Sequence, residues 1–165
     1  MQLTIVPYHG VDPSELSQLA NDLETQQYQV SIAHAQNLPQ RAFNSRRQQY
    51  MSEFFLRQLE QFEGQRVLGV INHDLYLYIL KCVYGLADLP GRVAIMSLYR
   101  LRTIENQLTF RRRMLKLAIH ELGHTHGLQH CHSSQCVMHH SPTLDALDHT
   151  PSMLCPHCQQ LFAHS

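Results

Sequence analysis

The first hundred residues alternate between short apolar runs and amphipathic stretches. Apolar runs at residues 3–6, 28–33, 66–71 and 92–99 predict four strands. Between them, helices are predicted from Asp12-Pro13 to about Leu23 and over residues 46–62, with Gly64 just past the second. A further helix is predicted over 109–126 and closed by Gly127. Strands and helices therefore follow one another in sequence.

This order of elements predicts an α/β fold. The run at 66–71 (RVLGVI) is apolar at nearly every position, which is typical of a strand covered on both faces of a sheet. Two successive strand–helix–strand units favour right-handed crossovers and a twisted mixed β-sheet with flanking helices. The 165 residues fit a single domain, 1–165. We expect a sheet-and-helix part over about 1–127 and a C-terminal part over about 128–165, where periodicity is weak.

Composition and charge narrow the range of partners. Hydrophobic residues make up 44% and charged residues 16% of the chain, and 13 basic residues balance 13 acidic ones. A nucleic-acid binder or a membrane-surface protein usually carries a basic surplus, so neither partner is expected. The one basic run, at 111–113, is interpreted as a solvated helix face rather than a binding patch.

Neither a membrane anchor nor an export signal is predicted. No run approaches the ~20 apolar residues that cross a bilayer. The start, MQLTIVPYHG, lacks a basic region followed by a long apolar one. We therefore expect a cytoplasmic protein with reduced cysteines, in which clustered cysteines indicate metal before disulfides. Cys82, within the apolar stretch ILKCVYGL, is expected to be a buried, unreactive thiol.

Potential metal ligands are concentrated at the C-terminal end. Ten of the 13 histidines lie in the last 46 residues, and so do four of the five cysteines. Because this segment shows no evident core of its own, bound metal is the natural means of holding it in place.

Residues 120–130, HELGHTHGLQH, place three histidines and a glutamate in the spacing HExxHxxGxxH. His120 and His124 are four residues apart and so project from one face of a helix. Gly127 can adopt the left-handed conformation that turns the chain and brings His130 round as a third ligand. Three histidines leave the fourth position of a tetrahedral zinc open to water, as in catalytic sites.

Glu121 stands beside the predicted metal without being needed as a ligand. It can accept the proton of a metal-activated water and return it to a leaving amine, which would hydrolyse a peptide bond. The alternative is a helix with incidental surface histidines, but the added Gly and third His make the pattern specific. His126 and His132 are not assigned as ligands; exposed, rim or supporting positions are expected for them.

Four cysteines form a second candidate metal site. Cys131, Cys136, Cys155 and Cys158 give C-x4-C and a distant C-x2-C, which suits a tetrahedral structural zinc that fastens the tail. Two disulfides and a nucleic-acid-binding zinc ribbon are the rival interpretations. Four histidines are close enough in sequence to replace a cysteine ligand: His132, His139, His140 and His157.

These motifs resemble the archaemetzincin family, which carries HExxHxxGxxHC, then C-x-M, then a distant CxxC. The chain has HELGHTHGLQHC, then Cys136-Val137-Met138, then Cys155-Pro156-His157-Cys158. The segments at 46–59, 67–87 and 93–102 are also similar to core segments of that family.

The resemblance implies a compact metzincin-like domain with an active-site helix and two zinc ions per chain. His120, His124 and His130 would bind the catalytic zinc, and the four cysteines would bind the structural one. Glu121 would be the general base, and Met138 would be the methionine-turn residue beneath the metal. The implied activity is a zinc metallopeptidase acting on a peptide or protein substrate, aminopeptidase-like in some members of the family. We expect the segment 139–152 to form part of the substrate-pocket wall.

Two other functions compete with the enzyme. A non-catalytic zinc-binding or interaction domain could keep the same scaffold, but it would not need Glu121. A nucleic-acid-binding zinc module is opposed by the zero net charge and by the open three-histidine site.

Overall fold

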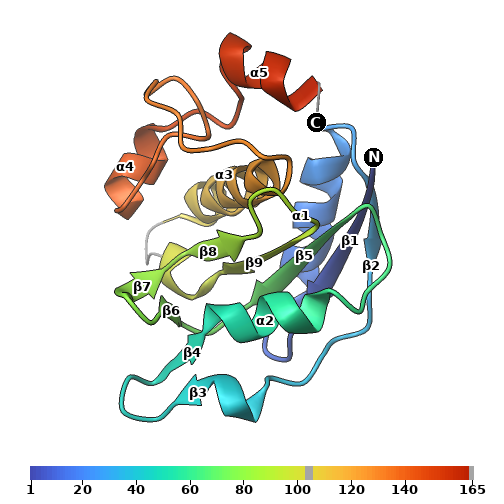
Figure 1. The fold of residues 1–165 in the computed structure, drawn as a ribbon, viewed down its shortest axis with the longest axis vertical. Helices are drawn as coiled ribbons and strands as arrows, with labels where there is room; N and C mark the ends of the chain where they lie inside the picture. Colours follow the sequence, from blue (N-terminus) through green and yellow to red (C-terminus); the bar gives the residue numbers. More distant parts are fainter. Residues whose placement is uncertain (103–105, 164–165) are drawn as a thin grey trace.

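The structure is a computed structural model that describes residues 1–102 and 106–163. Its centre is a five-stranded sheet in the order β2-β1-β5-β9-β8 (Figure 1). The first four strands of this order run parallel, and β8 pairs antiparallel with β9. The strands are β1 (Gln2–Pro7), β2 (Gln29–Ile32), β5 (Arg66–Ile71), β8 (Gly85–Ala87) and β9 (Val93–Ser97). The predicted mixed α/β sheet is confirmed.

Side-chain alternation along the central strands explains how the sheet is buried on both faces. Leu68 and Val70 face a core shared with α1 (Pro13–Glu24) and α3 (Gln107–Thr125). Val67 and Ile71 face a second core shared with α2 (Ser52–Leu59). Because successive side chains point to opposite faces, a strand covered by helices on both sides reads as a continuous apolar run.

A second, four-stranded sheet has the order β3-β4-β6-β7. Its strands are β3 (Phe43–Asn44), β4 (Gln49–Met51), β6 (Leu75–Leu77) and β7 (Leu80–Val83). The prediction of one helix over 46–62 is wrong in its first third, because Tyr50 pairs with Leu75 in this sheet. Gln48, with φ 54°, lies outside helical backbone geometry, so α2 begins only at Ser52.

The C-terminal part lies over α3 and carries α4 (Leu144–His149) and α5 (Pro156–Ala163) (Figure 1). Two short 3-10 turns complete the fold, η1 (Gln40–Ala42) and η2 (Tyr99–Leu101). This part has a small core of its own around Leu128 and Val137. The absence of periodicity after residue 127 therefore reflects short elements rather than a lack of packing.

Two expectations about individual side chains need correction. Cys82 is exposed on β7, because that strand belongs to the small second sheet rather than to the main core. The basic run is not a uniformly solvated face, because Arg111 pairs with Asp22 and the buried Arg113 pairs with Asp148. Among the described residues, no helix is long and apolar enough to cross a membrane.

Candidate active site and metal centres

Three histidines gather at the C-terminal end of α3. This helix begins after Asn106, whose side chain accepts a hydrogen bond from the Leu108 amide. His120 and His124 project from its last turns, and Gly127, with φ 84°, reverses the chain as predicted. His130 then returns to the pair, and the candidate ligand atoms of the three rings lie within 4.8 Å of one another.

Two of these rings are held by backbone carbonyls. His120 Nδ1 lies 2.8 Å from the Val137 carbonyl oxygen, and His124 Nδ1 lies 2.7 Å from that of Leu128. A carbonyl oxygen only accepts hydrogen bonds, so each Nδ1 carries the proton and each Nε2 of the neutral ring presents a lone pair. Burial lowers the pKa of His120 to about 4 and also lowers that of His124, which keeps both rings neutral.

The facing Nε2 atoms of His120 and His124 are 3.1 Å apart. Two lone pairs at this distance repel each other unless a cation lies between them. Nitrogens that bind one tetrahedral zinc at about 2.0–2.1 Å are separated by about 3.3 Å. The donor set and its spacing therefore fit zinc.

Glu121 is buried next to this cluster. Its side chain is 5% exposed, and burial raises its pKa to about 8. The carboxylate lies against β8, where a Cβ atom on Gly85 would be only 2.5 Å from Glu121 Oε1. The sequence contained no signal for this role of Gly85, because it depends on contact between β8 and α3.

Met138 lies directly beneath the histidine-bearing turns. It is fully buried, and its sulfur lies over Gly123, so any side chain at position 123 would collide with it. The Cys131 amide donates to the Met138 carbonyl at 2.8 Å. Met138 thus links the loop after His130 to helix α3 at Gly123. Gly123 is a second glycine whose importance is seen only in the packed structure.

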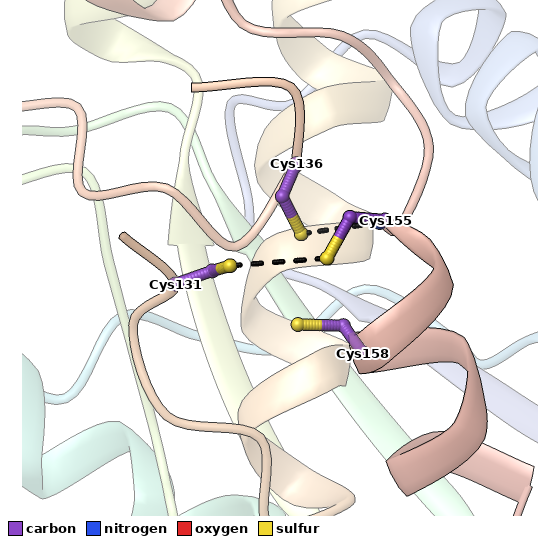
Figure 2. A group of neighbouring side chains, drawn as sticks. All are labelled: Cys131, Cys136, Cys155 and Cys158. Atoms are coloured by element: carbon purple, nitrogen blue, oxygen red, sulfur yellow. Dashed lines mark hydrogen bonds between the residues drawn. The ribbon is translucent and has the colours of Figure 1, made fainter. Parts of the chain in front are cut away.

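The four C-terminal cysteines also converge (Figure 2). Cys131 and Cys136 come from the loop after His130, Cys155 directly precedes α5, and Cys158 lies in its first turn. Cys131 Sγ is 3.9 Å from Cys155 Sγ, and their candidate ligand atoms all lie within 4.8 Å of one another. Thiolates on one zinc, with bonds of about 2.3 Å, are separated by about 3.8 Å, so this group also fits zinc.

The other histidines of this region take separate positions. His126 is buried, so the expected exposed position is wrong for it, and its Nδ1 lies 3.3 Å from Arg66 Nη2. His132 and His157 are exposed. His139 Nδ1 lies 3.0 Å from the Cys131 carbonyl oxygen. The ring of His140 lies 4.8 Å from that of His130, centroid to centroid, yet His140 is outside the group of three.

Comparison with known proteins places these features in a family. The model of Peptidase family M54 matches residues 20–164. An archaemetzincin of Archaeoglobus fulgidus is 35% identical over 159 residues, which cover 96% of each chain. An archaemetzincin of Halobacterium salinarum is 34% identical over 170 residues, covering 97% of this chain and 98% of the other.

Solved structures agree with this similarity. The crystal structure of the Archaeoglobus fulgidus archaemetzincin matches with a TM-score of 0.91 and 33% identity, covering 98% of this chain and 99% of that one. The archaemetzincin structure from Methanopyrus kandleri also matches with a TM-score of 0.91, at 32% identity, covering 99% of this chain and 94% of that one.

Proposed function

We propose that the two ligand clusters have different roles, one catalytic and one structural. The chain belongs to peptidase family M54 and is a zinc metallopeptidase. His120, His124 and His130 hold the catalytic zinc, and Glu121 is the general base. The observation that carries this assignment is the pair of facing Nε2 atoms, 3.1 Å apart, with the buried Glu121 carboxylate on the same helix. Zinc is thereby assigned two sites per chain, one catalytic and one structural.

Glu121 performs the proton transfers. When bound, zinc supplies the Lewis acid that activates water and the scissile carbonyl, and its charge lowers the pKa of the nearby Glu121 carboxyl. The carboxylate of Glu121 then accepts a proton from the attacking water at an Oε atom. It returns that proton to the nitrogen of the leaving amine, and the peptide bond is cleaved. Burial of Glu121 excludes bulk water that would otherwise compete for this proton.

Strand β8 orients the substrate backbone. It is the last strand of the five-stranded sheet, and the Gly85 backbone lies against Glu121. An edge strand presents backbone N–H and C=O groups to which an extended peptide can add as a further strand. A peptide bound in this way passes next to Glu121, and the segment 139–152 forms the opposite wall of the substrate site.

The four cysteines bind the structural zinc. Val137, whose carbonyl accepts the hydrogen bond from His120, directly follows the ligand Cys136. The cysteine site therefore fixes the segment that orients a catalytic ligand. This arrangement supports one domain over 1–165, in which the C-terminal part completes the active site.

A non-catalytic zinc-binding domain is not favoured. Such a domain gains nothing from Glu121, whereas burial of an ionisable carboxyl costs stability. The carboxylate is better explained by its use in proton transfer.

Two substitutions test the assignment. Glu121→Gln keeps side-chain size but removes the base, so we expect unchanged zinc content and a loss of peptidase activity of roughly 100-fold or more. His120→Ala should lose both the catalytic zinc and activity. The measurements are peptide-library digestion read by mass spectrometry and metal analysis of the same preparations. Full activity in Glu121→Gln would reject the mechanism.

A further inference from the structure

His140 lies against His130, outside the group of three candidate ligands. Its ring contacts that of His130 at 4.8 Å between centroids, with an angle of 44° between the planes. Among the described residues, the ring contact of His140 within the cluster is with His130. His140 is exposed, and within the described part of the chain its ring nitrogens have no hydrogen-bond partner.

The backbone that carries His140 is firmly held. The Val137 amide donates to the Met153 carbonyl at 2.9 Å, and the His139 amide donates to the Cys136 carbonyl at 2.9 Å. Ser141, on the other side of His140, has its hydroxyl 3.0 Å from that of Thr150. The ring therefore extends from an anchored backbone, although its polar atoms contact no protein group.

Two groups that are not assigned as metal ligands lie near the cluster. Glu121 is packed against β8, whereas His140 contacts the ligand that the loop contributes, His130. A peptide that adds to β8 and reaches the three histidines would meet both the Glu121 carboxylate and the exposed His140 ring. Peptide hydrolysis needs both a base for the attacking water and a donor for the carbonyl oxygen, which becomes negative in the transition state.

We propose that His140 is a further catalytic residue, which touches the substrate and donates a ring N–H hydrogen bond to the oxygen of the scissile carbonyl. The proton stays on the imidazole nitrogen throughout, and no bond to His140 forms or breaks. The hydrogen bond strengthens as charge develops on the oxygen, so it acts mainly on the transition state. This inference rests on the proposed peptidase mechanism.

Three variants separate hydrogen bonding from packing. His140→Phe keeps a ring against His130 but removes the donor, so kcat should fall about 100-fold while KM changes less than about threefold. His140→Gln keeps an N–H donor and should recover part of this loss. His132→Phe, at an exposed histidine outside both clusters, is the matched control and should behave like the parent. Zinc content and melting temperature should be unchanged in all three.

A measurement of binding affinity tests the proposal without depending on catalytic turnover. The probe is a phosphinic peptide, whose tetrahedral anion mimics the charged oxygen, compared with the amide peptide of the same sequence. His140→Phe should weaken phosphinate binding by at least tenfold and leave amide binding within about twofold. Parent-like affinity for the phosphinate, or loss of zinc in His140→Phe, overturns the proposal. A parent protein that cleaves no peptide, or a Glu121→Gln variant with parent-like activity, instead counts against the peptidase mechanism itself.

Discussion

Glu121 keeps its position because Gly85 has no side chain. A methyl group at residue 85 would lie 2.5 Å from Glu121 Oε1 and 2.6 Å from Cδ, so Gly85→Ala must push the carboxylate aside. A displacement of about 1 Å at a catalytic group can reduce the rate about 100-fold. We expect Gly85→Ala to lose activity on this scale while zinc content stays unchanged, as measured by steady-state kinetics and metal analysis.

The control for this prediction is Lys81→Ala, on the exposed strand β7 that precedes β8. It should keep parent activity. Full activity in Gly85→Ala would mean that the carboxylate moves without consequence, which contradicts its role as a positioned base.

The same burial makes the metal-free protein sensitive to pH. Burial raises the pKa of Glu121 from its ordinary 4.5 to about 8 in the folded chain, so the folded state holds an extra proton between these values. Stability must therefore fall as pH rises through this window, at up to about 1.4 kcal/mol per pH unit. Burial instead lowers the pKa of His120 to about 4, so below pH 6.5 that group makes stability rise with pH.

Between about pH 4.5 and 6.5 these two contributions oppose each other, and above pH 6.5 only the destabilising contribution of Glu121 remains. Denaturant unfolding of the protein after zinc removal should show a decline from pH 6.5 to 8, and Glu121→Gln should abolish that decline. A metal-free parent that becomes more stable from pH 6.5 to 8 would contradict the shifted pKa of Glu121.

At the scale of elements, two contacts attach α5 to the rest of the chain: the cysteine cluster, and the ring of Phe162 packed on that of His126. Cys158 is 4% exposed and is the ligand candidate that α5 itself supplies, within its first turn. Because structural zinc binding is coupled to folding, Cys158→Ser should loosen the tail. Limited proteolysis should then cut first after roughly Met138, within the segment that loses its anchor.

The matched control is Cys82→Ser, which removes an exposed thiol outside the cluster. It should resist protease like the parent. Equal resistance of Cys158→Ser would show that the four-cysteine group does not hold the tail.

The elements that could be predicted from the sequence are those whose hydrophobic pattern lies within the element itself. Residues 66–71 were predicted as a strand at the observed bounds of β5, because both of its faces are buried by helices. The helix prediction over 46–51 is wrong because the pairing of Tyr50 and Met51 with β6 is not encoded in the local pattern. Likewise, the spacing of His120, His124 and His130 follows from helix geometry, whereas Gly85 and His140 meet the cluster only through tertiary packing.

At the scale of the whole molecule, the two ligand clusters share one segment. Cys131 directly follows His130, and Val137, next to Cys136, accepts the hydrogen bond from His120. In the proposed two-zinc arrangement, the three histidines can therefore lose their metal while the cysteine site still holds the segment. The reverse is not expected, because loss of the cysteine site releases the groups that orient His120 and His130.

This asymmetry predicts the order in which a chelator removes metal. His130 is exposed and its cluster offers three protein ligands, whereas Cys136 and Cys158 are buried in a four-ligand site. Chelator treatment should remove one zinc first and abolish activity without increasing protease sensitivity. One equivalent of zinc should then restore activity. The second zinc should leave slowly, and only then should the tail be cleaved.

Thiol titration during chelation identifies which ion has left. Of the five cysteines, only Cys82 is exposed and outside the cluster, so one thiol should react in the two-zinc form. The count should remain one after the first zinc leaves and should rise to five when the second leaves, because thiolates bound to zinc react slowly. Five reactive thiols at the first step, or a total of one zinc per chain in the untreated protein, would contradict the two-site arrangement.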